Sequence, residues 1–311
     1  MGKDVKWCDY FKDNRRYADI INGVLCEGQQ VVSQGDLTEL DTRSKAKSRD
    51  LVCKAAIGVN FAIIGIENQD EVDYELPVRI MEYDVNRYRQ QIAAISKDVR
   101  ANSKDLRSGE YMYGFKKNSC LYPVMTIVLY AGVEPWDGPE SLREMINFTD
   151  IPDSIKTLVQ DYRIKVVDIR RLTDTSMFQT DVAKVFDFIR FSEKWDELYQ
   201  LVSSDSYYQN MDEDAYEVVA KYANIRKEGT VKMNEFRGKD GKFDMCKGIK
   251  DLMENSKEEG REEGRSLGAA QERQNIIANM LEMNKDIEEI CAIVKCDVEY
   301  VQKIIRDIEG K

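Results

Sequence analysis

Apolar residues along the first two thirds of the chain alternate between the spacing of helices and that of strands. Residues 10–25 carry apolar side chains every three or four positions, which predicts a helix. Strand-like stretches follow at residues 30–33, 37–40, 50–57 and 61–67, and Gly58 supplies a turn between the last two. The final stretch, FAIIGIE, is apolar on both faces until it reaches ENQDE, which indicates a central strand buried in a sheet.

A second series of elements follows this central strand. Pro77 is typical of a first helical position and opens a predicted helix over residues 77–96. We expect the buried stripe of this helix to be Val78, Met81, Val85, Tyr88, Ile92 and Ile95. Strands are then predicted at residues 124–130 and 164–169, and helical patterns extend over residues 178–202.

The order of these elements predicts an α/β fold around one mixed sheet, because helices and strands alternate along the chain. Strand patterns do not return after residue 202, so we expect an all-α C-terminal region. A change of composition near Ser203 divides the chain into three predicted parts. They are an α/β domain over residues 1–205, a helical connector over 206–255, and a glycine-repeat segment with a small helical tail over 256–311.

The C-terminal part repeats glycine every four residues, at Gly260, Gly264 and Gly268. Each glycine costs a helix about 1 kcal/mol relative to alanine, so a continuous helix here needs a compensating contact. One interpretation is a stripe of small residues on which a second copy packs, which gives a homo-oligomer, most simply a dimer. The other interpretation is a charged, partly helical linker.

Three short helices are predicted beyond the glycine repeat, at residues 276–281, 287–294 and 298–308. They resemble a helix-turn-helix unit, whose second helix reads DNA and is expected to be basic. Residues 251–311, however, carry a net charge of −6. This charge favours a structural or oligomerisation role for the tail.

The chain has 311 residues, no histidine and a net charge of −11. Without imidazole, Ser-His-Asp triads, His-activated cysteines and histidine metal ligands are excluded. The seven cysteines contain no C-x-x-C pair, which favours reduced thiols over a disulfide or zinc scaffold. The first residues form no apolar signal segment and no apolar run is long enough to cross a bilayer, so we expect a cytoplasmic protein without a membrane partner.

The polar end of the central strand carries the candidate chemistry. Alternate residues of a strand share a face, so Glu67 and Gln69 are expected on one side. If the strand that starts at Asp50 pairs with the central strand, the Asp50 carboxylate reaches the same edge. Converging carboxylates bind Mg²⁺ or Mn²⁺ in preference to zinc. Asp50 and Glu67 are therefore the predicted metal ligands, and Gln69 is expected to orient a water or a phosphate oxygen.

Two basic segments accompany this edge in an otherwise acidic chain. Residues 43–54 contain five basic residues and one acid, and residues 87–117 contain eight basic residues and three acids. A metal ion beside this positive charge suits a phosphodiester substrate, because the metal lowers the pKa of a bound water and neutralises charge that develops on the phosphate. Arg49 and Lys54 are candidate substrate contacts in the first segment.

Four short elements occur in order along the first half of the chain: IENQ, Pro77-x-Arg79, Tyr83-Asp84 and WDGP. Together with the surrounding segments RDLVCKAA, FAIIGIENQDEVDYELPVRIMEYDVNRYRQQI and PVMTIVLYAGVEPWDGPESLREMINF, they resemble the Rpn family of recombination-promoting nucleases. The resemblance covers residues 10–200. That family belongs to the PD-(D/E)XK nuclease superfamily, so the resemblance implies an αβββαβ nuclease core, in agreement with the predicted order of elements.

The resemblance also implies roles for individual residues. The first acidic motif of the superfamily falls on Asp50, and its (D/E)-x-K motif falls on Glu67 and Gln69, with glutamine in place of lysine. The helix after the central strand is implied to contact substrate, with Arg79 and Gln91 as candidates. The implied activity is Mg²⁺-dependent cleavage of DNA by an endonuclease that acts in recombination or on mobile elements.

Gln69 leaves alternatives open, because the lysine that usually assists the nucleophile is missing. One alternative is a non-catalytic nucleic-acid-binding or regulatory protein on a degenerate nuclease scaffold. Another is a ribonuclease, which only a comparison of substrates separates from a DNA endonuclease.

Overall fold

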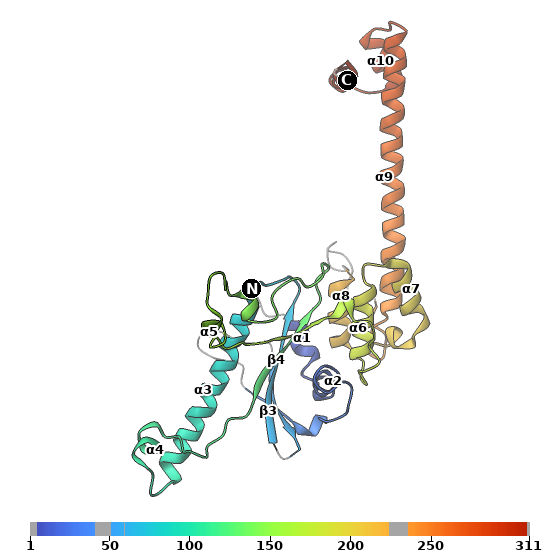
Figure 1. Cartoon of the computed structure of the whole chain (residues 1–311). Coiled ribbons are helices and arrows are strands. Elements are labelled where there is room, and N and C mark those ends of the chain that lie inside the picture. The colour runs from blue at the N-terminus through green and yellow to red at the C-terminus, as the bar shows by residue number, and fades with distance from the viewer. Residues whose placement is uncertain (1–4, 41–50, 59, 224–235, 310–311) are drawn as a thin grey trace. The chain divides into compact units, whose positions relative to one another are not determined.

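The computed structural model describes residues 5–40, 51–58, 60–223 and 236–309. The chain divides into two compact units, Met1–Lys247 and Gly248–Lys311. The first contains a five-stranded mixed sheet with helices packed on it, and the second is helical in the part that is described (Figure 1). The predicted α/β class and the all-α C-terminal region are confirmed, since no strand follows the sheet in the described ranges.

The sheet has the strand order β1-β2-β3-β4-β5. The strands are β1 (Leu37–Glu39), β2 (Leu51–Ile57), β3 (Asn60–Gln69), β4 (Val124–Tyr130) and β5 (Lys165–Asp168). The pairs β1–β2 and β2–β3 are antiparallel, and the pairs β3–β4 and β4–β5 are parallel. Gly58, with a φ of 59°, forms the predicted turn between β2 and β3. β3 is the central strand and is buried over most of its length, as predicted.

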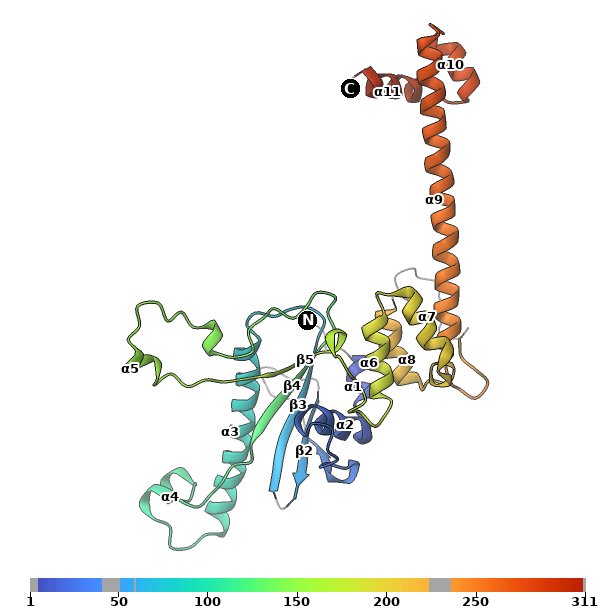
Figure 2. The same ribbon diagram turned by 45° about the vertical axis from the view of Figure 1, so that its right-hand side comes forward.

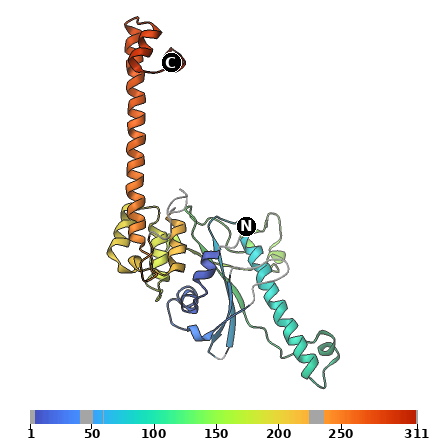
Figure 3. The same ribbon diagram turned by 180° about the vertical axis from the view of Figure 1, so that it is seen from behind.

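The first unit has helices on both faces of this sheet, with α2 on one face and α3 on the other (Figures 2 and 3). The helices of this unit are α1 (Val5–Tyr10), α2 (Asn14–Leu25), α3 (Leu76–Asn102), α4 (Ser108–Tyr113), α5 (Asp153–Lys156), α6 (Val182–Phe191), α7 (Trp195–Ser204) and α8 (Glu213–Tyr222), with 3-10 helices at Gln34–Asp36, Arg143–Met145, Ile169–Arg171 and Ser206–Gln209. On one face, the Tyr17 hydroxyl of α2 donates to the Ile64 carbonyl at 2.7 Å. On the other, Ile80 of α3 belongs to the same apolar cluster as Val128 of β4.

Residues 30–33 form no strand, in contrast to the prediction. Asn22 of α2 takes the hydrogen bonds that a neighbouring strand would make. Its Oδ1 accepts from the amides of Val31 and Val32 at 3.0 and 2.9 Å, and its Nδ2 donates to the Val32 carbonyl at 2.7 Å. A buried amide side chain thus replaces a strand partner. The predicted helix over residues 178–202 is also divided, into α6 and α7.

Helix α3 is longer than predicted and turns a different face to the sheet. Its buried residues are Leu76, Pro77, Ile80, Tyr83, Asp84 and Val99. Val85 and Ile92 of the predicted stripe are 43% and 40% exposed, so the predicted stripe is wrong. The reason is a carboxylate on the inner face. Asp84 accepts hydrogen bonds from the Thr126 hydroxyl at 3.1 Å and the Tyr162 hydroxyl at 2.5 Å, which fixes the rotation of the helix.

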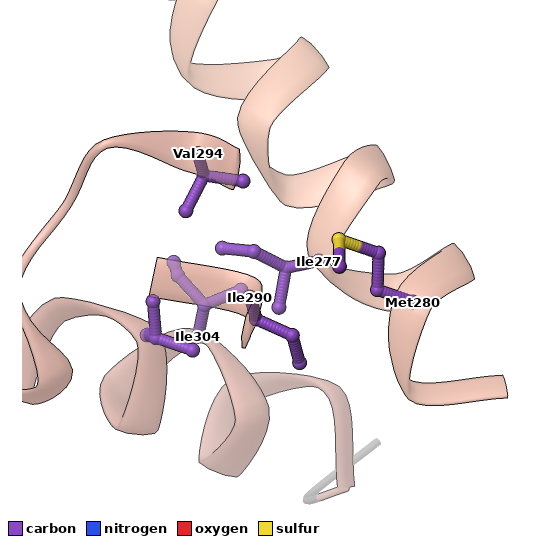
Figure 4. Packing of buried hydrophobic residues seen from close by; sticks show 6 residues of the cluster. Ile277, Met280, Ile290, Val294 and Ile304 are labelled. Carbon is purple, nitrogen blue, oxygen red and sulfur yellow. The ribbon is translucent and has the colours of Figure 1, made fainter. Parts of the chain in front are cut away.

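The second unit contains most of α9 (Met245–Glu282), followed by α10 (Ile287–Val294) and α11 (Val298–Glu309). α9 is one continuous helix through Gly260, Gly264 and Gly268, and among the described residues a methyl group on any of them would meet no atom within 4 Å apart from the helix's own neighbouring backbone. Beyond the glycines, the three helices enclose a small apolar core (Figure 4). It consists of Ile277, Met280, Ile290, Val294, Val301 and Ile304.

Candidate functional site at the end of β3

Glu67 and Gln69 lie at the carboxyl end of β3, opposite Val128 and Tyr130 of the parallel strand β4. The backbone alternation puts both side chains on one face, as predicted, and Gln69 Nε2 donates to Glu67 Oε1 at 3.4 Å. Glu67 is only 7% exposed. A carboxylate at such a depth is costly unless it has partners, so its surroundings decide what it can do.

The first turns of α3 bring a cation to this carboxylate. Arg79 Nη2 lies 3.4 Å from Glu67 Oε1, and Arg79 Nη1 donates to Asp73, which lies between β3 and α3. The Arg79 side chain is itself mostly buried, at 18% exposure. Arg79, predicted as a substrate contact, is thus held at the candidate site by two carboxylates. A guanidinium binds carboxylate and phosphate oxygens with the same geometry, so it can also receive a phosphate.

A second buried carboxylate, Asp84, lies on the same helix and is 1% exposed. Its partner Thr126 pairs with Gly65, two residues before Glu67. Both carboxylates therefore lie on the face of the sheet that α3 covers. Sequence reasoning gave Asp84 no role of its own. The available signal was its position four residues after Ile80, which places it on the same face of the helix as a core residue.

Lys54 and Gln91 are not brought to Glu67. Lys54 Nζ lies 3.8 Å from the centre of the Phe61 ring and 4.7 Å from that of Tyr122. The Cα partner of Lys54 is four residues before Glu67, which corresponds to about 13 Å along the strand. Gln91 Nε2 donates to the Tyr122 carbonyl at 3.1 Å and its Oε1 accepts from the Tyr122 amide at 2.7 Å. Both side chains thus meet at Tyr122, and their predicted substrate contacts stay predictions.

Asp50 and Arg49 lie outside the described residues. Leu51, the residue bonded to Asp50, pairs with Ile66, the neighbour of Glu67. In the described ranges, no group of three Cys, Asp or Glu side chains is placed to hold a metal ion. The donors next to β3 are the carboxylate of Glu67 and the amide of Gln69, whose oxygens suit Mg²⁺ in kind. A complete metal site here requires Asp50 in addition.

A cysteine nucleophile is not available in this part of the sheet. Cys53 of β2 pairs with Ile64 of β3 and is buried. Burial raises the pKa of the Cys53 thiol to about 12. Since the thiolate is the reactive form, this cysteine is inert at neutral pH. The chemistry at the end of β3 therefore depends on carboxylate, amide and guanidinium groups.

No family model, curated protein or solved structure matches this chain. None of the described helices is both long enough and apolar enough to span a bilayer.

Proposed function

We propose that this chain is a metal-dependent DNA endonuclease with a PD-(D/E)XK-like core. The observation that supports the proposal is the buried Glu67 at the end of β3, with Gln69 and Arg79 on it and with β2 beginning directly after Asp50. The order α2-β1-β2-β3-α3-β4 is the αβββαβ order that the resemblance implies. A role in recombination or mobile-element movement is part of the same proposal.

Each residue has a chemical task in this proposal. Asp50 and Glu67 would hold Mg²⁺, or Mn²⁺, which supplies a water of lowered pKa and positive charge beside the scissile phosphate. Gln69 orients a water or phosphate oxygen through its amide, but it carries no positive charge. Arg79 lies at the same edge and donates to a phosphate oxygen, and so supplies the cation that lysine provides in related nucleases.

A second candidate function is a nucleic-acid-binding protein without turnover, and the position of Arg79 favours it. The guanidinium lies 3.4 Å from Glu67 Oε1, where it neutralises the carboxylate without a metal ion. Gln69 does not restore the missing lysine. In this case the chain binds nucleic acid in a salt-dependent way and cuts nothing.

Nicking of supercoiled plasmid DNA in Mg²⁺, with an RNA of the same sequence as a second substrate, tests the proposal. Glu67→Gln and Asp50→Asn remove one charge each and should lower the cleavage rate on the order of 100-fold or more, because metal-derived stabilisation is worth several kcal/mol. Glu71→Gln, at an exposed carboxylate after β3, is the matched control and should cut normally. Unimpaired cutting by both site variants would exclude this site, and DNA binding by the wild type without any cutting would favour the second candidate.

We further propose that a homodimer forms through α9, since one such site cuts one strand and two are needed for a double-strand break. The open surface at Gly260, Gly264 and Gly268 supports this contact, because no described residue outside the helix's own neighbouring turns packs against the three glycines. Leucine at all three positions should lower the mass measured by sedimentation. An unchanged mass would remove α9 from the dimer contact.

A further inference from the structure

The far end of α3 carries α4, and we call residues 92–122 the α4 arm. Figures 1, 2 and 3 show α4 at the end of α3, away from the sheet. Two contacts with the arm's own residues fix α4 there. Gly114, with a φ of 63°, packs so closely on α3 that a Cβ would lie 2.1 Å from Ser96 Oγ. The Glu110 carboxylate accepts from the amides of Arg107 and Lys117, both at 3.1 Å, and so ties both flanks of α4 together.

The arm exposes aromatic side chains, which the rest of the first unit mostly buries. Tyr111, Met112 and Tyr113 are 73%, 63% and 72% exposed. The largest fully buried side chains include Trp7, Tyr10, Tyr17, Tyr130, Tyr208 and Tyr216. Neighbouring exposed rings on a fixed turn of helix contribute little to folding, and exposed apolar groups of this kind mark binding surfaces.

The arm also carries an excess of positive charge, with six basic residues against three acids. Its basic residues are Lys97, Arg100, Lys104, Arg107, Lys116 and Lys117. None of the six forms an ion pair with a described carboxylate, whereas Arg16 and Arg79 each bind two. One of the acids, Glu110, is engaged by backbone amides, which hold the pKa of its carboxyl below the usual value and keep it charged. The arm thus combines an excess of positive charge with two exposed rings.

We propose that the α4 arm binds single-stranded nucleic acid. Tyr111 and Tyr113 stack on unpaired bases, and the six cations contact the phosphates on either side. A duplex shows its phosphates but hides its base faces, so the two rings add affinity only for an unpaired strand. An anionic membrane surface is a poorer fit, because interfacial helices need a long apolar face, and the sequence of α4 is SGEYMY.

The inference deepens the proposed nuclease function, on which its biological meaning rests, by naming the form of the substrate. Arg79 and Ser96 are separated by 17 residues of α3, or about 25 Å along the helix. A stacked strand advances about 3.4 Å per nucleotide, so about 7 nucleotides connect the arm to Glu67. The substrate is then a nucleic acid with an unpaired segment at that distance from the point of cleavage.

Fluorescence anisotropy of the full chain in EDTA tests the inference, with a labelled single strand of about 20 nucleotides and the matching duplex. Tyr111→Ala with Tyr113→Ala should weaken single-strand binding about 30-fold or more, since stacking on two bases is lost. Duplex binding should change less than about 3-fold, because its phosphate contacts remain. The double Tyr→Phe variant keeps both rings and should bind as the wild type does. Trp195→Ala, at a 38% exposed ring of α7, is the matched control and should have no effect.

A charge variant provides the second arm of the test. Lys116→Gln with Lys117→Gln should lower the salt slope of single-strand binding by about 1.4, or about 0.7 for each lost phosphate contact. Wild-type affinity in the double tyrosine variant, or an equal loss for duplex and single strand, would overturn the inference. Tyrosine-dependent binding to phosphatidylserine vesicles without binding to the single strand would assign the arm to a membrane surface instead.

The two proposals fail separately. Glu67→Gln should abolish cleavage and leave single-strand binding in EDTA unchanged, because Glu67 is far from the arm. If the wild type binds the single strand through its tyrosines but never cuts, the proposed nuclease function is overturned and the proposed binding by the α4 arm is supported. If the wild type cuts but its single-strand binding does not depend on the tyrosines, the proposed binding by the α4 arm is overturned and the nuclease function is supported.

Discussion

The first unit contains two buried clusters of charge, around Arg16 and around Glu67, and their geometries differ. Arg16 of α2 is 4% exposed. Its Nε and Nη2 donate to the two oxygens of Asp181 at 2.8 and 2.9 Å, and its Nη1 donates to Asp214 of α8 at 2.5 Å. Burial lowers the pKa of the Arg16 guanidinium, but its hydrogen bonds to Asp181 and Asp214 outweigh burial and raise that pKa. The charge is permanent and closely bound.

At Glu67 the contacts with Gln69 and Arg79 are both 3.4 Å long, and both come to the same oxygen. The contacts of Arg16, in contrast, are short, and they join α2 to the start of α6 and to α8. Such contacts are typical of a structural ion pair. The contacts of Glu67 with Gln69 and Arg79 are longer and join side chains within twelve positions of each other, so these two contacts constrain the fold little. The comparison indicates that the contacts of Arg16 stabilise the fold more than the contacts of Glu67 with Gln69 and Arg79 do.

The largest expected effect separates these roles. Arg16→Met should lower the free energy of unfolding by about 3 kcal/mol, because two carboxylates lose their cation. Glu67→Gln should lower it by less than about 1 kcal/mol, since Arg79 keeps its bond to Asp73 and the amide keeps the shape. Urea unfolding followed by circular dichroism measures both.

Arg15→Met is the matched control for Arg16→Met. Arg15 is one position away, pairs with Asp13 and has a side chain that is 68% exposed, so its loss should cost far less than that of Arg16. Adding Asp181→Asn and Asp214→Asn to Arg16→Met should restore part of the lost stability. A cost below about 1 kcal/mol for Arg16→Met would end the distinction between the two clusters.

Sequence patterns predicted much of the sheet because its strands are continuous apolar runs. β4 has the predicted bounds, and the β2–β3 turn is at Gly58 as expected. The placement of Glu67 and Gln69 on one face also followed, since it depends only on strand alternation. Asp50 was predicted from the pairing of its strand with the central strand and from the resemblance of the motifs, and it lies outside the described residues.

Tertiary partners decided the features that the patterns missed. Asn22 replaced a strand partner for residues 30–33, and Asp84 placed a carboxylate on the buried face of α3. In the Arg16 cluster, Asp181 and Asp214 lie 165 and 198 positions along the chain from Arg16. No local spacing in the sequence predicts such pairs. The exposure of the Tyr111 ring is of the same kind, because an exposed and a buried tyrosine look alike in the sequence.

A smaller effect belongs to the hydroxyl at the rim of the Arg16 cluster. Tyr207 donates to Asp181 Oδ2 at 2.8 Å. Burial raises the pKa of the Tyr207 hydroxyl, and the charge of Asp181 raises it further, so the proton stays on the oxygen. Tyr207→Phe should cost about 1.5 kcal/mol, as expected for a hydrogen bond to a charged group. Tyr74→Phe removes a similar bond, to Asp137 at 3.0 Å on a 61% exposed tyrosine, and should cost much less than Tyr207→Phe. Equal costs would show that burial of the cluster does not matter.

The smallest expected effect is at the start of helix α2 and depends on pH. Asp13 caps α2 by accepting from the Arg15 amide at 2.8 Å. The Arg15 guanidinium, more than that amide, holds the pKa of the Asp13 carboxyl below its usual value of 3.8, although partial burial opposes this. A lowered folded pKa means that the stabilisation is complete above the unfolded pKa and is lost as pH falls through the folded value.

Asp13→Ala should therefore cost about 1 kcal/mol near neutral pH, and the cost should shrink when the carboxyl of the wild type is protonated in acid. As pH begins to fall from neutral, the cost of Arg16→Met should decrease much less than the cost of Asp13→Ala, because the guanidinium keeps its charge at every pH used. Urea unfolding of both variants and the wild type, from neutral pH down to about one unit below the usual aspartate pKa, measures the two dependences. A cost for Asp13→Ala that is constant with pH would show that the cap acts through shape and that its charge contributes nothing.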